Sequence, residues 1–217
     1  METIELQGLD WDSFVVFIVA MVTILNPIGA LPIFAGMTAD RSDAEKRNLV
    51  AKAALSVAVI LLIVTWSGGF LLEMFGLSIH AFQAAGGLII LLLGLSMLNS
   101  EPSGQQRTED EVEEAGGRDS IAIVPIAIPI VAGPGAITTV LLETQKYPHF
   151  GEKIDISIVA ILMGVLFWAC FHFAAPIAHR LGVAGVAVVT RVMGMILAAI
   201  AIGMMAGGLK GLFPGLA

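Results

Sequence analysis

The stretch Asn26-Pro27-Ile28-Gly29-Ala30-Leu31-Pro32 interrupts a long apolar run between residues 13 and 38. Asn, Pro and Gly are residues at which helices stop or bend. Here they fall where a membrane-spanning helix would cross the centre of the bilayer. A second stretch, Ala132-Gly133-Pro134-Gly135-Ala136-Ile137-Thr138-Thr139, repeats the pattern, with Pro134 following Pro27 by 107 residues. We therefore expect a chain organised around two breaks in membrane helices.

The composition indicates that lipid, and not water, surrounds most of the chain. Of the 217 residues, 57% are hydrophobic and 13% are charged, and the mean hydropathy is +0.91. A soluble domain has roughly 25% charged residues, so this chain has too few to cover a water-facing surface. The length allows a single membrane domain, 1–217, without a sizeable soluble module. The single cysteine, Cys170, excludes an internal disulfide.

Six apolar segments are long enough to be membrane spans, each near or above the roughly 20 residues that cross the hydrocarbon core. We therefore predict an all-α membrane protein with six transmembrane helices. The first and fourth helices are expected to be broken at mid-membrane, because each contains one of the two stretches. The segments are 13–38, 49–73, 79–98, 120–142, 154–173 and 192–212.

The basic residues predict the orientation of these helices. Eight of the 11 Lys and Arg fall on one side of the predicted topology, which should be cytoplasmic. Both termini then lie outside, in the periplasm. The loop 99–119, which is rich in Asp and Glu, lies on the cytoplasmic side and is expected to be a solvated linker. The eight residues are Arg41, Lys46, Arg47, Lys52, Arg107, Arg118, Arg180 and Arg191.

The two halves of the chain are predicted to be repeats. Segments within 13–98 match segments within 120–212 at a nearly constant offset, with Pro27 aligned to Pro134. Because each half has three spans, an odd number, the two halves must insert in opposite directions. The expected fold is an inverted 3+3 repeat, a topology that recurs in secondary transporters.

Four motifs in this order resemble the MarC family of bacterial inner-membrane proteins. They are Asn26-Pro27-Ile28-Gly29-Ala30-Leu31-Pro32-Ile33-Phe34, Ala81-Phe82-Gln83-Ala84-Ala85-Gly86-Gly87, Ile128-Pro129-Ile130-Val131-Ala132-Gly133-Pro134-Gly135-Ala136-Ile137-Thr138-Thr139-Val140 and Thr190-Arg191-Val192-Met193-Gly194. Asn26 stands where the family commonly has Asp, and Gln83 stands where Arg is common. The family is similar to the lysine-exporter superfamily, and some relatives are described as neutral amino-acid transporters. The resemblance thus implies transport of small solutes.

The two breaks have the chemistry of a binding site. Asn accepts a bond from a free backbone N–H, and Pro fits the first position of a helix, so Asn26 is expected to cap a half-helix that starts at Pro27. Gly133 and Pro134 offer the same start. The N-terminus of a helix carries about half a positive charge and unpaired N–H groups, which suit a carboxylate. The predicted substrate-binding residues are Asn26, Pro27, Ile28, Gly29, Gly133, Pro134, Gly135, Thr138 and Thr139.

Two further roles are predicted, and two plainer interpretations stay open. Gly29, Gly133 and Gly135 are the expected hinges, and Arg191 is an expected cytoplasmic anchor of the sixth helix. Each break is also readable as a simple kink that neighbouring helices accommodate. Asn26 is equally readable as a cap without a substrate contact.

The leading functional prediction is a secondary transporter of small neutral amino acids or similar polar solutes in the bacterial inner membrane. No charged or His side chain lies near the centre of any segment; Glu73, Glu143 and His172 lie close to segment ends. Exporters of cationic drugs and proton relays need titratable groups at depth, whereas a zwitterion suits helix dipoles alone. We expect alternating access, with one repeat moving against the other.

Other functions are weighed against this one. A passive small-solute channel and a structural inner-membrane protein without transport activity remain alternatives. An enzyme is not expected, because the sequence has no His-Glu-x-x-His, no Gly-x-Ser-x-Gly and no buried pair of acids, and no basic patch suggests nucleic acid. No cofactor is expected, and Na⁺ or H⁺ coupling is undecided. Ala199, Gly203 and Gly207 permit close helix packing within the chain or between copies, so the oligomeric state is open.

Overall fold

The computed structural model describes residues 8–31, 34, 38, 41–99, 133–213 and 215, with the backbone alone for 175–179, 181 and 183. No strand occurs in these residues, so the predicted all-α fold is confirmed. The linker 99–119, from residue 100 on, and the fourth segment as far as residue 132 lie outside the described residues. The helices are α1 (Trp11–Leu25), α3 (Asp43–Met74), α4 (Ile79–Asn99), α6 (Pro134–Lys146), α7 (Phe150–His172) and α8 (Ala174–Leu212).

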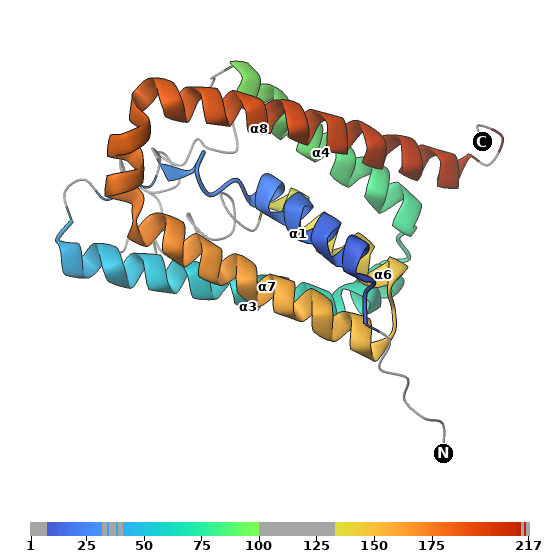
Figure 1. The fold of residues 1–217 in the computed structure, drawn as a ribbon. Helices are drawn as coiled ribbons and strands as arrows, with labels where there is room; N and C mark the ends of the chain where they lie inside the picture. The colour runs from blue at the N-terminus through green and yellow to red at the C-terminus, as the bar shows by residue number, and fades with distance from the viewer. Residues whose placement is uncertain are drawn as a thin grey trace.

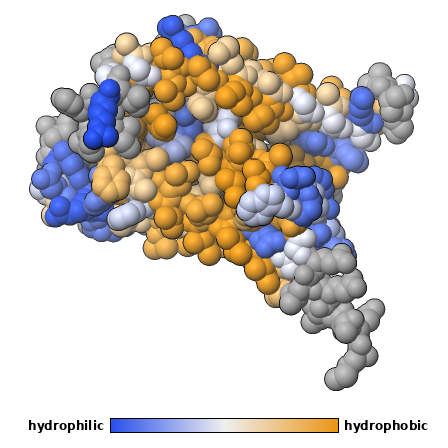
Figure 2. Space-filling view, viewed as in Figure 1, coloured by the Kyte–Doolittle hydropathy of each residue, from blue (hydrophilic) through white to orange (hydrophobic). Residues whose placement is uncertain are grey.

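Four of these helices are long and apolar enough to cross a membrane: α3, α4, α7 and the Ala184–Leu212 part of α8. They fall on the second, third, fifth and sixth predicted segments. α1 is also apolar but has only 15 residues, since it ends at the first predicted break. Hydrophobic residues cover the middle of the molecular face in Figure 2, and hydrophilic residues gather mainly toward its two ends. This is the surface of an integral membrane protein.

α8 begins earlier than the sequence predicted. Its first part starts at Ala174, and Gly182, with φ 62° and ψ 175°, forms a kink before the apolar span from Ala184. Glycine adopts this conformation without the steric cost that a Cβ would bring. Arg191, the expected anchor at the start of the sixth helix, therefore lies about two turns inside the span. Its side chain is exposed. The predicted start at residue 192 was wrong, and the anchoring role stays a prediction.

The helices pack as two antiparallel pairs with α1 and α6 between them (Figure 1). α4 lies along α8, α3 lies along α7, and α6 contacts both α3 and α4. Under the predicted repeat, α4 corresponds to α8 and α3 corresponds to α7. Each pair thus joins predicted equivalents, an arrangement that is compatible with a two-fold axis between the halves. The inverted repeat itself, and the breaks in the first and fourth helices, stay predictions.

Small residues allow these pairs to approach closely. A Cβ built on Gly94 of α4 would lie 2.9 Å from the carbonyl oxygen of Gly194 in α8, and one built on Gly194 would lie 2.8 Å from the carbonyl oxygen of Gly94. In the other pair, a Cβ on Gly164 of α7 would lie 3.0 Å from the carbonyl oxygen of Ala54. Close backbone contact is a main source of helix association in lipid, where apolar burial gains little.

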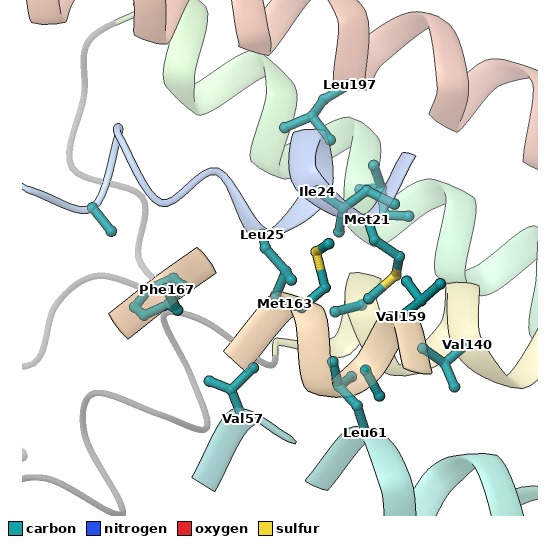
Figure 3. Close-up of a cluster of buried hydrophobic side chains, with 14 of the residues drawn as sticks. Met21, Ile24, Leu25, Val57, Leu61, Val140, Val159, Met163, Phe167 and Leu197 are labelled. Atoms are coloured by element: carbon teal, nitrogen blue, oxygen red, sulfur yellow. The ribbon is translucent and has the colours of Figure 1, made fainter. Parts of the chain in front are cut away.

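The buried side chains meet where α1 crosses between the two pairs (Figure 3). Met21 and Ile24 of α1 are buried against residues of the surrounding helices. This core fixes the C-terminal end of α1 in the interior of the molecule. The residues labelled in Figure 3 are Met21, Ile24, Leu25, Val57, Leu61, Val140, Val159, Met163, Phe167 and Leu197.

Candidate functional site

α1 ends at Leu25, and Asn26 follows it in the left-handed conformation with φ 40° and ψ 60°. It is the only residue other than Gly with a positive φ among the residues that the structure describes. Asn tolerates this conformation better than most residues do. The Asn26 N–H donates to the carbonyl oxygen of Val22 at 3.0 Å, which closes the helix. The sequence therefore located the end of α1 correctly.

The chain turns helically again after Asn26. The Oδ1 atom of Asn26 accepts the N–H of Gly29 at 3.3 Å, and its backbone carbonyl accepts the N–H of Ala30 at 3.3 Å. These are the bonds expected of an N-cap followed by Pro at the first helical position. Further on, the N–H of Phe34 donates to Ala30 at 3.0 Å. Residues 32, 33 and 35–37 lie outside the described residues, so the predicted half-helix there is untested.

Asn26 is also tied to α4. Its Nδ2 atom lies 3.8 Å from the sulfur of Met97 in a weak hydrogen bond. Asn26 is half-buried, and Pro27 is buried. The site residue is thus placed between α1 and the C-terminal part of α4.

α6 begins at the second predicted break, with Gly133 as its N-cap residue and Pro134 at its first position. The N–H groups of Ala136 and Ile137 donate to the carbonyl oxygen of Gly133 at 3.0 and 3.2 Å. In the described part of the chain, no side chain caps this end of the helix. Among the described residues, the N-terminal charge of the helix dipole therefore has no side-chain acceptor.

The end of α1 and the start of α6, where the two breaks are predicted, contact each other. A Cβ built on Gly135 would lie 3.4 Å from Cγ2 of Ile24, next to the end of α1, and 2.9 Å from Cγ1 of Ile90 in α4. Ile24, Ile90 and Gly135 are all buried. The C-terminal end of α1 and the N-terminal end of α6 thus lie side by side in an apolar surrounding. Of the predicted site residues, Gly135 thus lies beside Ile24, two residues before Asn26.

The two predicted threonines differ in environment. The hydroxyl of Thr139 donates to the carbonyl oxygen of Gly135 at 2.9 Å. Thr138 is only 2% exposed, and its side chain fills the space where a Cβ of residue 86 would lie. No hydrogen bond joins the Thr138 hydroxyl to another described residue. Thr138 is therefore a buried polar residue whose hydroxyl has no hydrogen-bond partner among the described residues.

A half-open pocket of about 300 Å³ lies between α4 and α6, beside the second break. Pro134 and Thr138 of the predicted site line it, together with residues of α4 that the sequence did not suggest as site residues. The α4 residues are spaced by three and four positions, which places them on one face of the helix. The sequence did not show that α6 packs against this face. The lining residues are Phe82, Ala85, Gly86, Ile89, Pro134, Ile137 and Thr138.

Hydrogen bonds near the far end of α6 join α1 to the second half of the chain. The hydroxyl of Tyr147 donates to Oγ of Ser13 at 2.8 Å, and the N–H of Leu9 donates to Oδ2 of Asp155 at 2.8 Å. Hydrogen bonds from Ser13 hold the pKa of the Asp10 carboxyl below its usual value. Charged groups thus gather at this end of the molecule and away from the breaks. Among the described residues, no three His, Cys, Asp or Glu lie together as in a metal site.

Comparison with known proteins finds relatives that match nearly the whole chain. The model of the MarC family, described as "MarC family integral membrane protein", matches residues 11–213. The UPF0056 membrane protein YhcE of Escherichia coli is 32% identical over 207 residues, or 95% of this chain and 96% of its own length. The UPF0056 membrane protein YvbG of Bacillus subtilis is 35% identical over 204 residues, or 93% of this chain and 97% of its own. No solved structure matches the chain.

Proposed function

The chain belongs to the MarC family of integral membrane proteins, and within that family we propose that it is a secondary transporter of small neutral amino acids or similar polar solutes. The observation that carries this proposal is the contact between the end of α1 and the start of α6, where the two breaks are predicted. The end of α1 and the start of α6 meet inside an apolar molecule, at Ile24 and Gly135. No enzymatic step is part of the proposal.

The backbone at the two helix ends supports recognition of a zwitterion. Because residue 27 is Pro and has no N–H, the carbonyl of Thr23 loses the partner that a continuing helix would give it. This carbonyl end of α1 suits an ammonium group, and the N-terminus of α6 suits a carboxylate. The two neighbouring helix ends carry partial charges of opposite sign. They therefore match the ammonium and carboxylate groups of an amino acid, and no charged side chain of the protein is needed.

The proposed transport cycle is alternating access around this site. One three-helix repeat moves against the other, with Gly29, Gly133 and Gly135 as hinges. The protein lies in the bacterial inner membrane with both termini in the periplasm. In support, the start of α1 and the end of α8 lie at the same side of the molecule (Figure 1). The described residues of the site include no titratable side chain, so coupling to Na⁺ or simple exchange fits at least as well as H⁺ coupling.

Counterflow in proteoliposomes tests the proposal. Vesicles loaded with unlabelled alanine should take up labelled alanine in a saturable manner when they contain the protein. Asn26→Gly tests the site without straining the backbone, because Gly accepts a positive φ. Saturable exchange that Asn26→Gly abolishes in folded protein supports the proposal. Permeation that rises linearly with concentration would instead indicate a channel, and no flux of any solute would indicate a structural protein.

A further inference from the structure

We propose that the pocket between α4 and α6 holds the side chain of the transported amino acid, and that the protein prefers aliphatic side chains such as those of valine and leucine to glycine and to polar side chains. This inference rests on the proposed function and adds a substrate class to it. The pocket is defined by Phe82, Ala85, Gly86, Ile89, Pro134, Ile137 and Thr138.

The lining chemistry selects an apolar occupant. Apart from the Thr138 hydroxyl, every side chain that lines the pocket is apolar, and Gly86 contributes backbone alone. A polar side chain such as that of serine would lose its hydrogen bonds to water there without finding enough partners. A volume of about 300 Å³ is at the small end of the range for ligand pockets, and glycine would leave it unfilled.

Pro134 joins the pocket to the start of α6. It is the first residue of that helix and also lines the pocket. A carboxylate held at the helix N-terminus therefore leaves the side chain of the same molecule beside α4. The backbone of the ligand and its side chain are recognised by neighbouring parts of one helix.

The buried hydroxyl group of Thr138 also indicates a ligand in this pocket. Its side chain is almost fully buried, lines the pocket and has no hydrogen bond to another described residue. Buried hydroxyl groups in folded proteins nearly always have a partner, because leaving one unpaired is costly. A polar backbone group of a bound amino acid would supply that partner at the edge of the apolar pocket. The pocket therefore has the parts of a ligand site: an apolar wall with one placed polar group.

Competition against alanine counterflow tests the side-chain preference. Unlabelled valine, leucine, glycine and serine are added outside proteoliposomes that exchange labelled alanine. We expect valine and leucine to inhibit exchange at lower concentrations than glycine and serine. Equal inhibition by all four, or none by valine and leucine, would overturn the inference while leaving transport intact. No saturable exchange of any amino acid would refute the proposed function itself.

A pair of matched variants on α4 tests the location. Ala85→Leu fills the pocket from an exposed position, and Ala81→Leu adds the same side chain one turn earlier, at an exposed position outside the pocket. Ala85→Leu should reduce the preference for leucine over glycine by about tenfold or more, because a leucine side chain would no longer be buried. Ala81→Leu should keep the wild-type preference. Equal effects of both variants, or a uniform loss for all substrates in folded Ala85→Leu, would overturn the assignment.

Discussion

The side-chain amide of Asn26 occupies the space in which a Cβ of residue 29 would have to lie. The same amide accepts the N–H of Gly29 through Oδ1 at 3.3 Å. Gly29 is therefore required by the close approach of Asn26, whatever its role as a hinge. The two residues together form the turn that ends α1 and starts the following helical turn.

Gly29→Ala should destabilise the protein. The new methyl group would displace the Asn26 side chain and break its hydrogen bond to residue 29, which predicts a loss of about 1–3 kcal/mol. Thermal unfolding in detergent measures the effect. Gly203→Ala in α8 is the matched control, because a Cβ there meets no atom within 4 Å. Equal melting temperatures for Gly29→Ala and wild type would contradict the proposed packing.

Two substitutions at Asn26 should separate stability from transport. Asn26→Leu forces a bulky residue into a left-handed conformation, which costs roughly 1–2 kcal/mol, whereas Asn26→Gly adopts it freely. We expect a lower melting temperature for Asn26→Leu than for Asn26→Gly, and loss of counterflow in both. Full counterflow by Asn26→Gly would show that the side chain does not bind substrate and is a cap alone.

Gly94→Leu should separate α4 from α8. A Cβ at this position would lie 2.9 Å from the carbonyl oxygen of Gly194 and 3.0 Å from the backbone nitrogen of Ala198, neither of which moves easily. Overpacking of this kind costs about 1–3 kcal/mol or more. Gly203→Leu is the control at an open position of the same helix pair. The idea fails if both variants unfold at the same temperature in detergent.

Asp155→Ala should release the segment before α1. The carboxylate of Asp155 accepts the N–H of Leu9 at 2.8 Å, and a bond to a charged acceptor protects an amide more than a neutral one does. Hydrogen exchange of the Leu9 amide should accelerate by roughly tenfold or more in Asp155→Ala. Asp155→Asn keeps an acceptor oxygen and should change less. Unchanged exchange in Asp155→Ala would show that this bond does not hold the segment.

Local sequence chemistry predicted the end of α1 and the start of α6. Asn before Pro at 26 and 27 fixed the end of α1, because Pro cannot donate to the preceding turn. Gly133 and Pro134 marked the start of α6 for the same reason. The apolar runs predicted the long spans, since lipid-exposed residues must be apolar along the whole helix. The start of α8 was missed because Arg180 and Arg191 were assigned to the cytoplasmic side, with Arg191 at the start of the span, whereas the helix runs through both residues.

Contacts between distant segments could not be predicted from the sequence. The approach of Thr138 to Gly86, which shapes the pocket, joins residues more than 50 positions apart. The sequence around Gly86 does not indicate that Thr138 is its neighbour, and the sequence around Thr138 does not indicate Gly86. Packing between helices depends on which faces of the two helices are in contact. The hydrogen bond between Leu9 and Asp155 joins residues 146 positions apart, and the sequence did not predict it for the same reason.

The most direct test of the account is protection of a cysteine at the second break by substrate. Thr139→Cys replaces one small side chain by another and is placed in a Cys170→Ala background, because Cys170 is the only cysteine. A small water-soluble thiol reagent should modify the cysteine, and alanine should slow this reaction in a saturable manner. Leu92→Cys, on the exposed apolar face of α4, should show no protection. Equal modification of Thr139→Cys with and without alanine would contradict a substrate site at the meeting of the two breaks.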